Sequence, residues 1–408
     1  MKTDKKEKLI PELRFPEFKE EWKQDRLGKI GSFSKGKNIS KKDIEEKGKY
    51  PCIRYGELYT HYKEHAKKII SRTNLEKNKL VFSKINDVII PSSGETAIDI
   101  STAVYIDQDN IALGGDLNIM RSPLHGYFLA LYLSNKKKYD IARLAQGISV
   151  IHLYPEHLKS LKINYPTLPE QQKISSFLSL IDRKIELLNK KKELLEIYKK
   201  GVMQKIFNRD IRFKDINGNN YPEWEEKRLG EILQEYVERT KDENQFPILS
   251  STKDGLFLQE EYFNKEIASE NNIGYKILRK NQIVFSPQNL WLGNINFNEK
   301  YEAGIVSPSY KIFNVDGTKI YPLFLKYIIK LPRMIYEYMT SSEQGASIVR
   351  RNLNMDLFKQ IKIKVPCKKE QKEIYEYLEK ITSLTVLTKN NLKQISLFKK
   401  GLLQKMFI

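Results

Sequence analysis

The residues best suited to catalysis or metal binding are few and poorly grouped. The chain has 408 residues but only five histidines and two cysteines. The pairs His61/His65 and His152/His157 have no third ligand type nearby, and the two cysteines are too far apart to suggest a disulfide framework. The sequence also lacks Gly-x-x-x-x-Gly-Lys-Ser/Thr, Gly-x-Gly-x-x-Gly, Gly-x-Ser-x-Gly and His-Glu-x-x-His. We therefore predict no catalytic residue, cofactor or metal here; an active site assembled from distant residues is the alternative.

The charge balance points to a polyanionic partner. Lys and Arg total 71 against 51 Asp and Glu, which gives a formal charge of +20 at pH 7. Such an excess favours nucleic acid or an anionic membrane face, whereas the alternative is a soluble protein from a Lys-rich proteome. With 40% hydrophobic residues the chain has enough apolar material for packed cores, and its length indicates two to four domains.

Polar and basic side chains gather on turns that follow apolar strands. The Gly-containing loop at 34–38 suits backbone phosphates, and turns such as 54–56 and 92–96 could bring hydrogen-bonding groups to base edges. Each turn taken alone is more often an ordinary solvated loop, but similar turns recur in both halves of the chain. The residues that we predict to contact DNA are Lys35, Lys37, Arg54, Tyr55, Ser92, Ser93, Glu95, Asp116, Gln146, Ser149 and His152 in the first half, and Ser250, Thr252, Lys253, Gln288, Asn289, Trp291, Tyr310, Gln344, Ser347, Arg350 and Arg351 in the second.

No segment reads as an export or membrane signal. The start, MKTDKKEKLIPELRF, is basic but is not followed by the apolar stretch of a signal peptide. No run approaches the roughly 18 apolar residues of a membrane span. We expect a cytoplasmic protein with no membrane partner.

The chain repeats itself, which determines how these residues must be arranged. KINYPTLPEQQKI at 162–174 returns as KIKVPCKKEQKEI at 362–374, and KKGVMQKIF at 199–207 returns as KKGLLQKMF at 399–407, both at an offset of 200 residues. The rest of each half also matches, more weakly. We divide the tandem duplication into module 1 (1–165), a first helical region (166–209), module 2 (210–364) and a second helical region (365–408).

The helical regions have coiled-coil spacing, and the modules mix strands with helices. Apolar residues alternate three and four positions apart in each helical region. The predicted seam contains Ile174, Leu178, Ile181, Ile185, Leu188 and Leu195 in the first copy, and Ile374, Leu378, Ile381, Leu392, Ile395 and Leu402 in the second. Each helix would be about 60 Å long, so its stripe needs a partner. The predicted fold class is α+β: two pseudo-symmetric α+β modules separated by two long helices that form an antiparallel coiled coil. Packing of each helix on its own module alone is the alternative.

These ordered motifs resemble the DNA-specificity subunits of type I restriction-modification enzymes. The resemblance covers nearly the whole chain. Its motifs are PELRFPEF with EEWKQDRLG at the start of module 1, and IRFKD with YPEWEEKRLG at the start of module 2. Each helical region then begins with LPEQQKI or KKEQKEI and ends with KKGxxQKxF. One departure is Cys367-Lys368-Lys369 where the first copy has Thr167-Leu168-Pro169, and the second seam also contains two threonines. We therefore expect the two ends to differ in how they dock partners.

The resemblance implies a non-catalytic subunit with two target-recognition domains. Each domain would read one half of an interrupted site in double-stranded DNA, and the helices would set the half-site spacing. Two methyltransferase subunits, which use S-adenosylmethionine to methylate adenine N6, would dock on the helices. Restriction and translocase subunits that use ATP and Mg would join to cleave unmodified DNA.

Two other functions compete with this interpretation. One is a self-contained nuclease, which would cleave plasmid in the presence of Mg²⁺ without a partner. The other is a coiled-coil scaffold for proteins, which strongly salt-dependent DNA binding would exclude.

Overall fold

The computed structural model describes residues 8–37, 39–263, 272–344 and 350–408. The chain forms two compact units, each of which is described separately. Unit 1 holds the chain up to Glu193 together with Leu387–Ile408, and unit 2 holds Leu194–Val386. Each unit thus combines one module with parts of both long helices, and the four-part division expected from the sequence stays a prediction.

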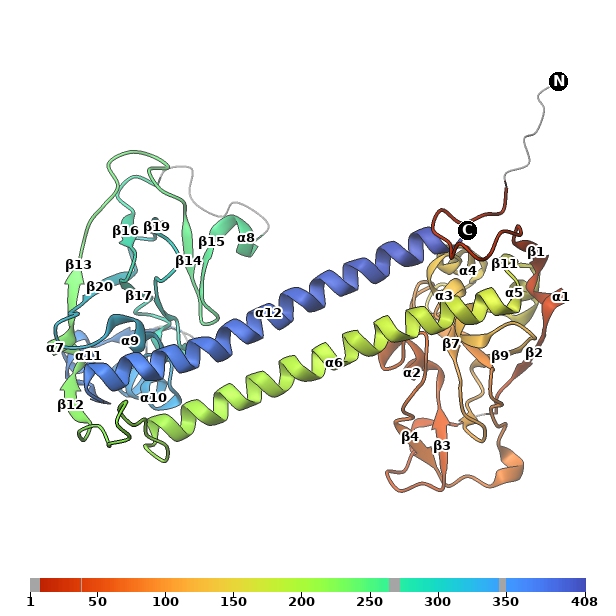
Figure 1. The fold of residues 1–408 in the computed structure, drawn as a ribbon, viewed down its shortest axis with the longest axis horizontal. Coiled ribbons are helices and arrows are strands. Elements are labelled where there is room, and N and C mark those ends of the chain that lie inside the picture. The colour runs from red at the N-terminus through yellow and green to blue at the C-terminus, as the bar shows by residue number, and fades with distance from the viewer. Residues whose placement is uncertain (1–7, 38, 264–271, 345–349) are drawn as a thin grey trace. The chain divides into compact units, whose positions relative to one another are not determined.

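Among its described residues unit 1 has four small sheets, and Figure 1 labels several of their strands. An antiparallel sheet has the order β2-β9-β5-β7, and a second has the order β4-β3-β8 with β3 and β8 parallel. β1 pairs with β11, and β6 pairs with β10. The elements are β1 (Lys23–Arg26), α1 (Leu27–Ile30), β2 (Ser32–Lys35), β3 (Tyr50–Ile53), α2 (Tyr55–Thr60), β4 (Ser71–Thr73), β5 (Val88–Pro91), β6 (Ser93–Gly94), β7 (Val104–Tyr105), β8 (Ala112–Leu113), β9 (Leu117–Arg121), α3 (Gly126–Asn135), α4 (Lys138–Leu144), β10 (Ile151–His152), α5 (Pro155–Ser160) and β11 (Lys162–Tyr165).

Unit 2 repeats this plan with variations. Its four-stranded antiparallel sheet has the order β13-β20-β17-β18, and β12 pairs with β23 as β1 does with β11. The elements are β12 (Glu225–Arg228), α7 (Leu229–Ile232), β13 (Leu233–Tyr236), β14 (Leu249–Ser251), β15 (Leu256–Leu258), α8 (Gln259–Phe263), β16 (Lys276–Arg279), β17 (Ile283–Phe285), β18 (Ile295–Phe297), β19 (Ala303–Val306), β20 (Lys311–Val315), α9 (Pro322–Ile328), α10 (Pro332–Thr340), β21 (Ser342–Gln344), β22 (Arg351–Leu353), α11 (Met355–Gln360) and β23 (Lys362–Val365).

Apolar runs in the sequence become the central elements of each unit. β5 and β17 are buried along their whole length, as expected of β-branched runs at the centre of a sheet. Helix α3 is buried on nearly every side, because it lies between the sheet and the long helices. The α+β fold class predicted from the sequence is confirmed.

The two long helices are continuous. α6 spans Leu168–Phe207 and α12 spans Lys368–Met406. In α6 the seam positions up to Ile181 are buried and the later ones are half-buried, with mostly exposed residues between them. In unit 1, Lys399 Nζ of α12 lies 2.8 Å from Asp182 Oδ1 of α6. In unit 2, Lys199 Nζ of α6 donates to Thr382 Oγ1 of α12 at 2.7 Å. The helices therefore pack on each other within both units.

The ends of the helices also complete the cores. Leu402, Leu403, Met406 and Phe407 of the second copy are buried in the main core of unit 1, beside the start of α6. Ile206 of the first copy is buried in the main core of unit 2. Packing of each helix on its own module alone, the alternative in the sequence analysis, is wrong.

The repeated Glu-Gln pair of the motif joins helix to module. Glu170, which is 1% exposed, accepts Arg14 Nε and Nη2 at 2.8 and 2.7 Å. Gln171 Oε1 accepts the backbone N–H of His125 just before α3, and its Nε2 donates to Pro166 O. Glu370 and Gln371 make the matching bonds in unit 2, with Arg212, Tyr321 and Pro366. The most similar residues of the two halves thus build the frame.

Candidate nucleic-acid interface

In each module, two neighbouring strands have predicted site residues at one end. At the other end they have a hydrogen-bonded pair of polar side chains, which we call the clamp. β5 and β9 are antiparallel, with Val88 opposite Met120 and Pro91 opposite Leu117. Asp87 and Arg121 therefore lie at one end of the pair, and Ser92 and Asp116 at the other.

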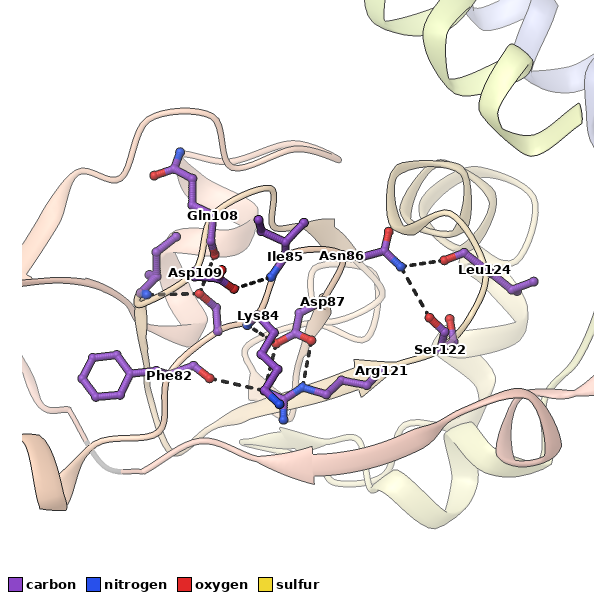
Figure 2. A network of polar contacts seen from close by, with 12 residues as sticks. Phe82, Lys84, Ile85, Asn86, Asp87, Gln108, Asp109, Arg121, Ser122 and Leu124 are labelled. Atoms are coloured by element: carbon purple, nitrogen blue, oxygen red, sulfur yellow. Dashed lines mark hydrogen bonds and ion pairs between the residues drawn. The ribbon is translucent and has the colours of Figure 1, made fainter. Parts of the chain in front are cut away.

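The clamp in unit 1 is an ion pair within a larger polar network (Figure 2). Arg121 Nε and Nη2 donate to the two oxygens of Asp87 at 2.9 and 3.1 Å. The Asp87 side chain is 2% exposed, and the hydrogen bond raises the pKa of Arg121. Asn86, with φ of +78°, donates from Nδ2 to the backbone oxygens of Ser122 and Leu124. The network fixes the strands, so that the polar turns at their opposite ends have a rigid base.

Unit 2 has the same arrangement with a neutral clamp. β17 and β20 are antiparallel, and Gln282 Nε2 donates to Asn314 Oδ1 at 2.7 Å at one end. At the other end lie Ser286 and Tyr310. Tyr310 thus precedes β20 as Asp116 precedes β9, and both were predicted from the sequence as DNA contacts.

A groove of about 690 Å³ opens at this end of module 1. Its lining includes the predicted residues Arg54, Tyr55 and Asp116, together with Lys41 and Thr60, which the prediction omitted. In the sequence Lys41 belongs to a Lys-Lys pair that follows the basic loop at 34–38, whereas no motif contains Thr60.

Arg54 is held in place at the groove by an acid. Its Nε and Nη2 both donate to Glu57 Oε1, at 2.9 and 2.8 Å. Glu57 is buried and also accepts the Ser71 hydroxyl. Arg54 therefore presents the rest of its guanidinium to the groove without a large loss of side-chain freedom on binding.

The basic loop lies against the same region. Lys35 ends β2 and pairs with Asn118 of β9, and Lys37 N donates to Leu113 O. Gly36 packs so closely on Gly114 that a Cβ there would lie 2.1 Å from Gly114 O. Lys35 and Lys37 are both exposed, and Lys37 Nζ donates to Asn78 O at 2.9 Å. The loop can thus present cationic groups beside the groove.

A short hairpin extends the surface of module 1. Gln146 and His152 exchange backbone hydrogen bonds, and β10 pairs with β6, so Gln146, Ser149 and His152 lie together on the exposed side. Ser92 and Ser93 lie beneath them at 5% and 7% exposure, and Glu95 is exposed just after β6. Burial leaves the two serines little surface for a ligand.

Module 2 places its predicted residues in two linked clusters. Ser251 Oγ donates to Asn294 Oδ1, and Tyr310 OH donates to Ser251 O, so Ser250, Thr252 and Tyr310 lie together. Ser250 is buried, Thr252 and Tyr310 are half-buried, and Lys253 is exposed. Asn294 was not predicted, because its role depends on sheet pairing rather than on a local motif.

The second cluster is organised by Arg351. Its guanidinium carbon lies 5.9 Å from the centroid of the Trp291 ring, and Nη2 donates to Ser342 O. Its backbone N donates to Gln288 O, and it pairs with Gln344 across β21 and β22. Asn289 accepts from Asn294 N, which joins the two clusters. Arg350 is exposed, and Ser347 lies outside the described residues.

Other candidate chemistry is sparse in the described parts of the chain. Burial raises the pKa of the Cys52 thiol to about 12, which makes it a poor nucleophile. Among the described residues, no group of three or more His, Cys, Asp or Glu is arranged to hold a metal. No described helix is both long and apolar enough to cross a membrane.

Two similar α+β modules, each with its polar turns gathered at the same strand ends, define a duplicated recognition protein. The family model for the type I restriction modification DNA specificity domain matches twice, at residues 19–197 and 221–397. The chain belongs to this family, and is a non-catalytic specificity subunit with two target-recognition domains.

Individual relatives agree with the family over nearly full length. The chain is 26% identical to the type I restriction enzyme MjaVIII specificity subunit of Methanocaldococcus jannaschii, covering 98% of this chain and 95% of the relative. It is 24% identical to the putative MjaX specificity subunit of the same organism, with the same coverage. Among solved structures, the S subunit of the type I system from M. genitalium matches with a TM-score of 0.62 and 19% identity, over 98% of this chain and 99% of that one. A chain from a study of type I R-M complex assembly and conformational transition matches with a TM-score of 0.52 and 13% identity, over 95% and 97%. At these identities, the two structural matches show that the fold is shared.

Proposed function

We propose that each module reads one half of an interrupted DNA site, and that the two long helices set the spacing between the half-sites. The observation that carries this proposal is the duplicated placement of different side chains on one frame. Asp116 and Tyr310 precede equivalent strands, while the Glu-Gln junctions are nearly identical. A constant frame with variable polar ends suits two readers of different sequences.

The charges of the chain support duplex DNA as the ligand. The formal charge is +20, and exposed lysines flank the groove of module 1. Phosphate contacts from such residues would supply affinity, and the groove and hairpin residues would supply the sequence preference.

We propose further that methyltransferase subunits dock on the outer faces of the helices. Leu180, Leu187 and Leu194 recur every seven residues on α6 and are 66%, 58% and 55% exposed. On α12, Leu387, Leu397 and Phe398 are also more than half exposed. Heptad spacing outside the inner seam is suited to further helices. In the cytoplasm two such subunits would bring S-adenosylmethionine to methylate adenine N6, and restriction subunits would bring ATP and Mg²⁺.

Binding of the purified chain to duplex DNA tests the proposal. We expect affinity to fall steeply with salt, because lysine contacts to phosphates release counterions. Salt-independent or absent binding at all salt concentrations would contradict the proposal and favour a protein scaffold. Plasmid cleavage by the chain alone with Mg²⁺ would instead indicate a nuclease.

A further inference from the structure

The hairpin beside the groove of module 1 ends in apolar side chains that face solvent. Ile148 is 98% exposed and Val150 is 52% exposed. The next isoleucine, Ile151, packs against the main core of unit 1. The hairpin is thus anchored by one isoleucine and presents another at its tip.

The base of the hairpin is fixed by backbone bonds. Gln146 N donates to His152 O at 2.9 Å, and His152 N donates to Gln146 O at 2.7 Å. Gly147 has φ of +127°, and a Cβ there would lie 2.1 Å from Val150 O, so the turn requires glycine. A side chain on so tight a turn loses little freedom when it enters a ligand.

The base of the hairpin is joined to the groove through the backbone of Ser92. The Ser92 N–H donates to Asp116 O, whose residue lines the groove, and the Ser92 carbonyl accepts Leu153 N next to the hairpin, both at 2.9 Å. Residues 145–154 contain no Asp or Glu, so no carboxylate within the hairpin repels a phosphate backbone.

We propose that Ile148 is an apolar wedge that enters between base pairs at the edge of the first half-site. The inference rests on the proposed function, namely that module 1 binds DNA. Isoleucine is among the side chains that can separate a base step and kink the duplex. Because pyrimidine–purine steps unstack most easily, the wedge selects such a step without a hydrogen bond to either base. In the sequence, Gln146-Gly147-Ile148-Ser149 is repeated as Gln344-Gly345-Ala346-Ser347, with Ala346 in place of the isoleucine. Unstacking by this residue is therefore confined to the first half-site.

The test measures base unstacking in a bound duplex. The full chain, without a methyltransferase subunit, is mixed with duplexes that carry the methylated motif and 2-aminopurine at successive positions. Flipping of the target adenine by a methyltransferase therefore cannot contribute to the fluorescence. Ile148→Ala is compared with Ile216→Ala, a matched control because Ile216 is 100% exposed on a turn of unit 2. Both changes remove the same atoms from exposed sites, so neither alters a core.

The wild type and Ile216→Ala should give a fluorescence rise at one step, and Ile148→Ala should lose it. We also expect Ile148→Ala to bind about tenfold more weakly, which corresponds to about 1.4 kcal/mol, with an unchanged salt slope.

Three results would overturn the wedge. An undiminished rise in Ile148→Ala refutes it while DNA binding by module 1 stands. If Ile148→Ala binds DNA normally but no longer retains a methyltransferase subunit added in a separate experiment, the tip docks protein instead. Failure of the wild-type chain to bind DNA at any salt concentration removes the proposed function as well, and so is distinguishable from failure of the wedge alone.

Discussion

Replacing Glu170 with Ala should destabilise unit 1 far more than removal of any surface ion pair. The change leaves Arg14, whose side chain is 11% exposed, without its carboxylate and removes the acceptor of Trp22 Nε1 at 3.3 Å. Breaking a buried pair costs about 3 to 5 kcal/mol. Since Arg14 Nη2 also donates to Glu20 O, we expect the lower end, about 3 kcal/mol.

A matched control lies one turn away on the same helix. Lys173 pairs with Glu17 at 3.4 Å, but both side chains are about half exposed, at 54% and 48%. Lys173→Ala should therefore cost less than about 1 kcal/mol. In unit 2, Glu370→Ala is the substitution equivalent to Glu170→Ala, because the fully buried Glu370 pairs with Arg212.

When the chain is labelled with 5-fluorotryptophan and unfolded in urea, the fluorine signals of its tryptophans report the unfolding of the two units separately. Trp22 reports on unit 1, and Trp224 and Trp291 report on unit 2. With an m-value of about 3 kcal/mol per M, a loss of about 3 kcal/mol lowers the Trp22 midpoint by about 1 M. Equal shifts for Glu170→Ala and Lys173→Ala, or no shift for Glu170→Ala, would refute the assignment of the Glu-Gln motif to the frame.

Three other changes follow from the same structure. Leu178→Asp places a charge at a fully buried seam position and should disrupt unit 1 and its assembly, so an unchanged elution volume on size-exclusion chromatography would count against the seam. Lys37→Ala should weaken binding to all DNA sequences and reduce the salt slope by about one, whereas an altered sequence preference with the same slope would contradict a phosphate contact. Burial lowers the pKa of His125 in the folded chain, so the unfolded chain binds the proton more readily. The stability that neutral His125 contributes above the unfolded pKa of about 6.5 should therefore be lost as the pH falls below that value. His125→Gln should flatten this pH dependence of stability in acid unfolding.

Local spacing was enough to predict the long helices, but it could not predict which distant residues meet. Heptad positions such as Ile174 and Leu178 define α6 in the sequence and are buried in the structure. The pairing of Arg14 with Glu170 spans 156 residues, so no local pattern contains it. The sequence showed that the Glu-Gln pair repeats, yet only the packing shows that it joins helix to module.

The sequence predicted the candidate site residues on separate turns, and the pairing of the strands brings those turns together. Arg54 and Tyr55 lie at the start of α2 and Asp116 lies just before β9, and all three line one groove. Ser92 and Ser93, which resemble other polar turn residues in sequence, are instead buried by the β6–β10 pairing. Burial of this kind depends on tertiary pairing and is not encoded in residue type.

Mapping of N6-methyladenine by single-molecule long-read sequencing tests most directly whether the two modules read separate half-sites. The host genome would be sequenced with the wild-type gene, without it, and with variants at Gln288 and Asn289, or at Tyr55 and Asp116. We predict that deletion removes one interrupted adenine motif, that the module 2 variants change only one half of it, and that the module 1 variants change only the other. A variant in one module that changes both halves, or the half assigned to the other module, would contradict separate reading of the half-sites by the two modules.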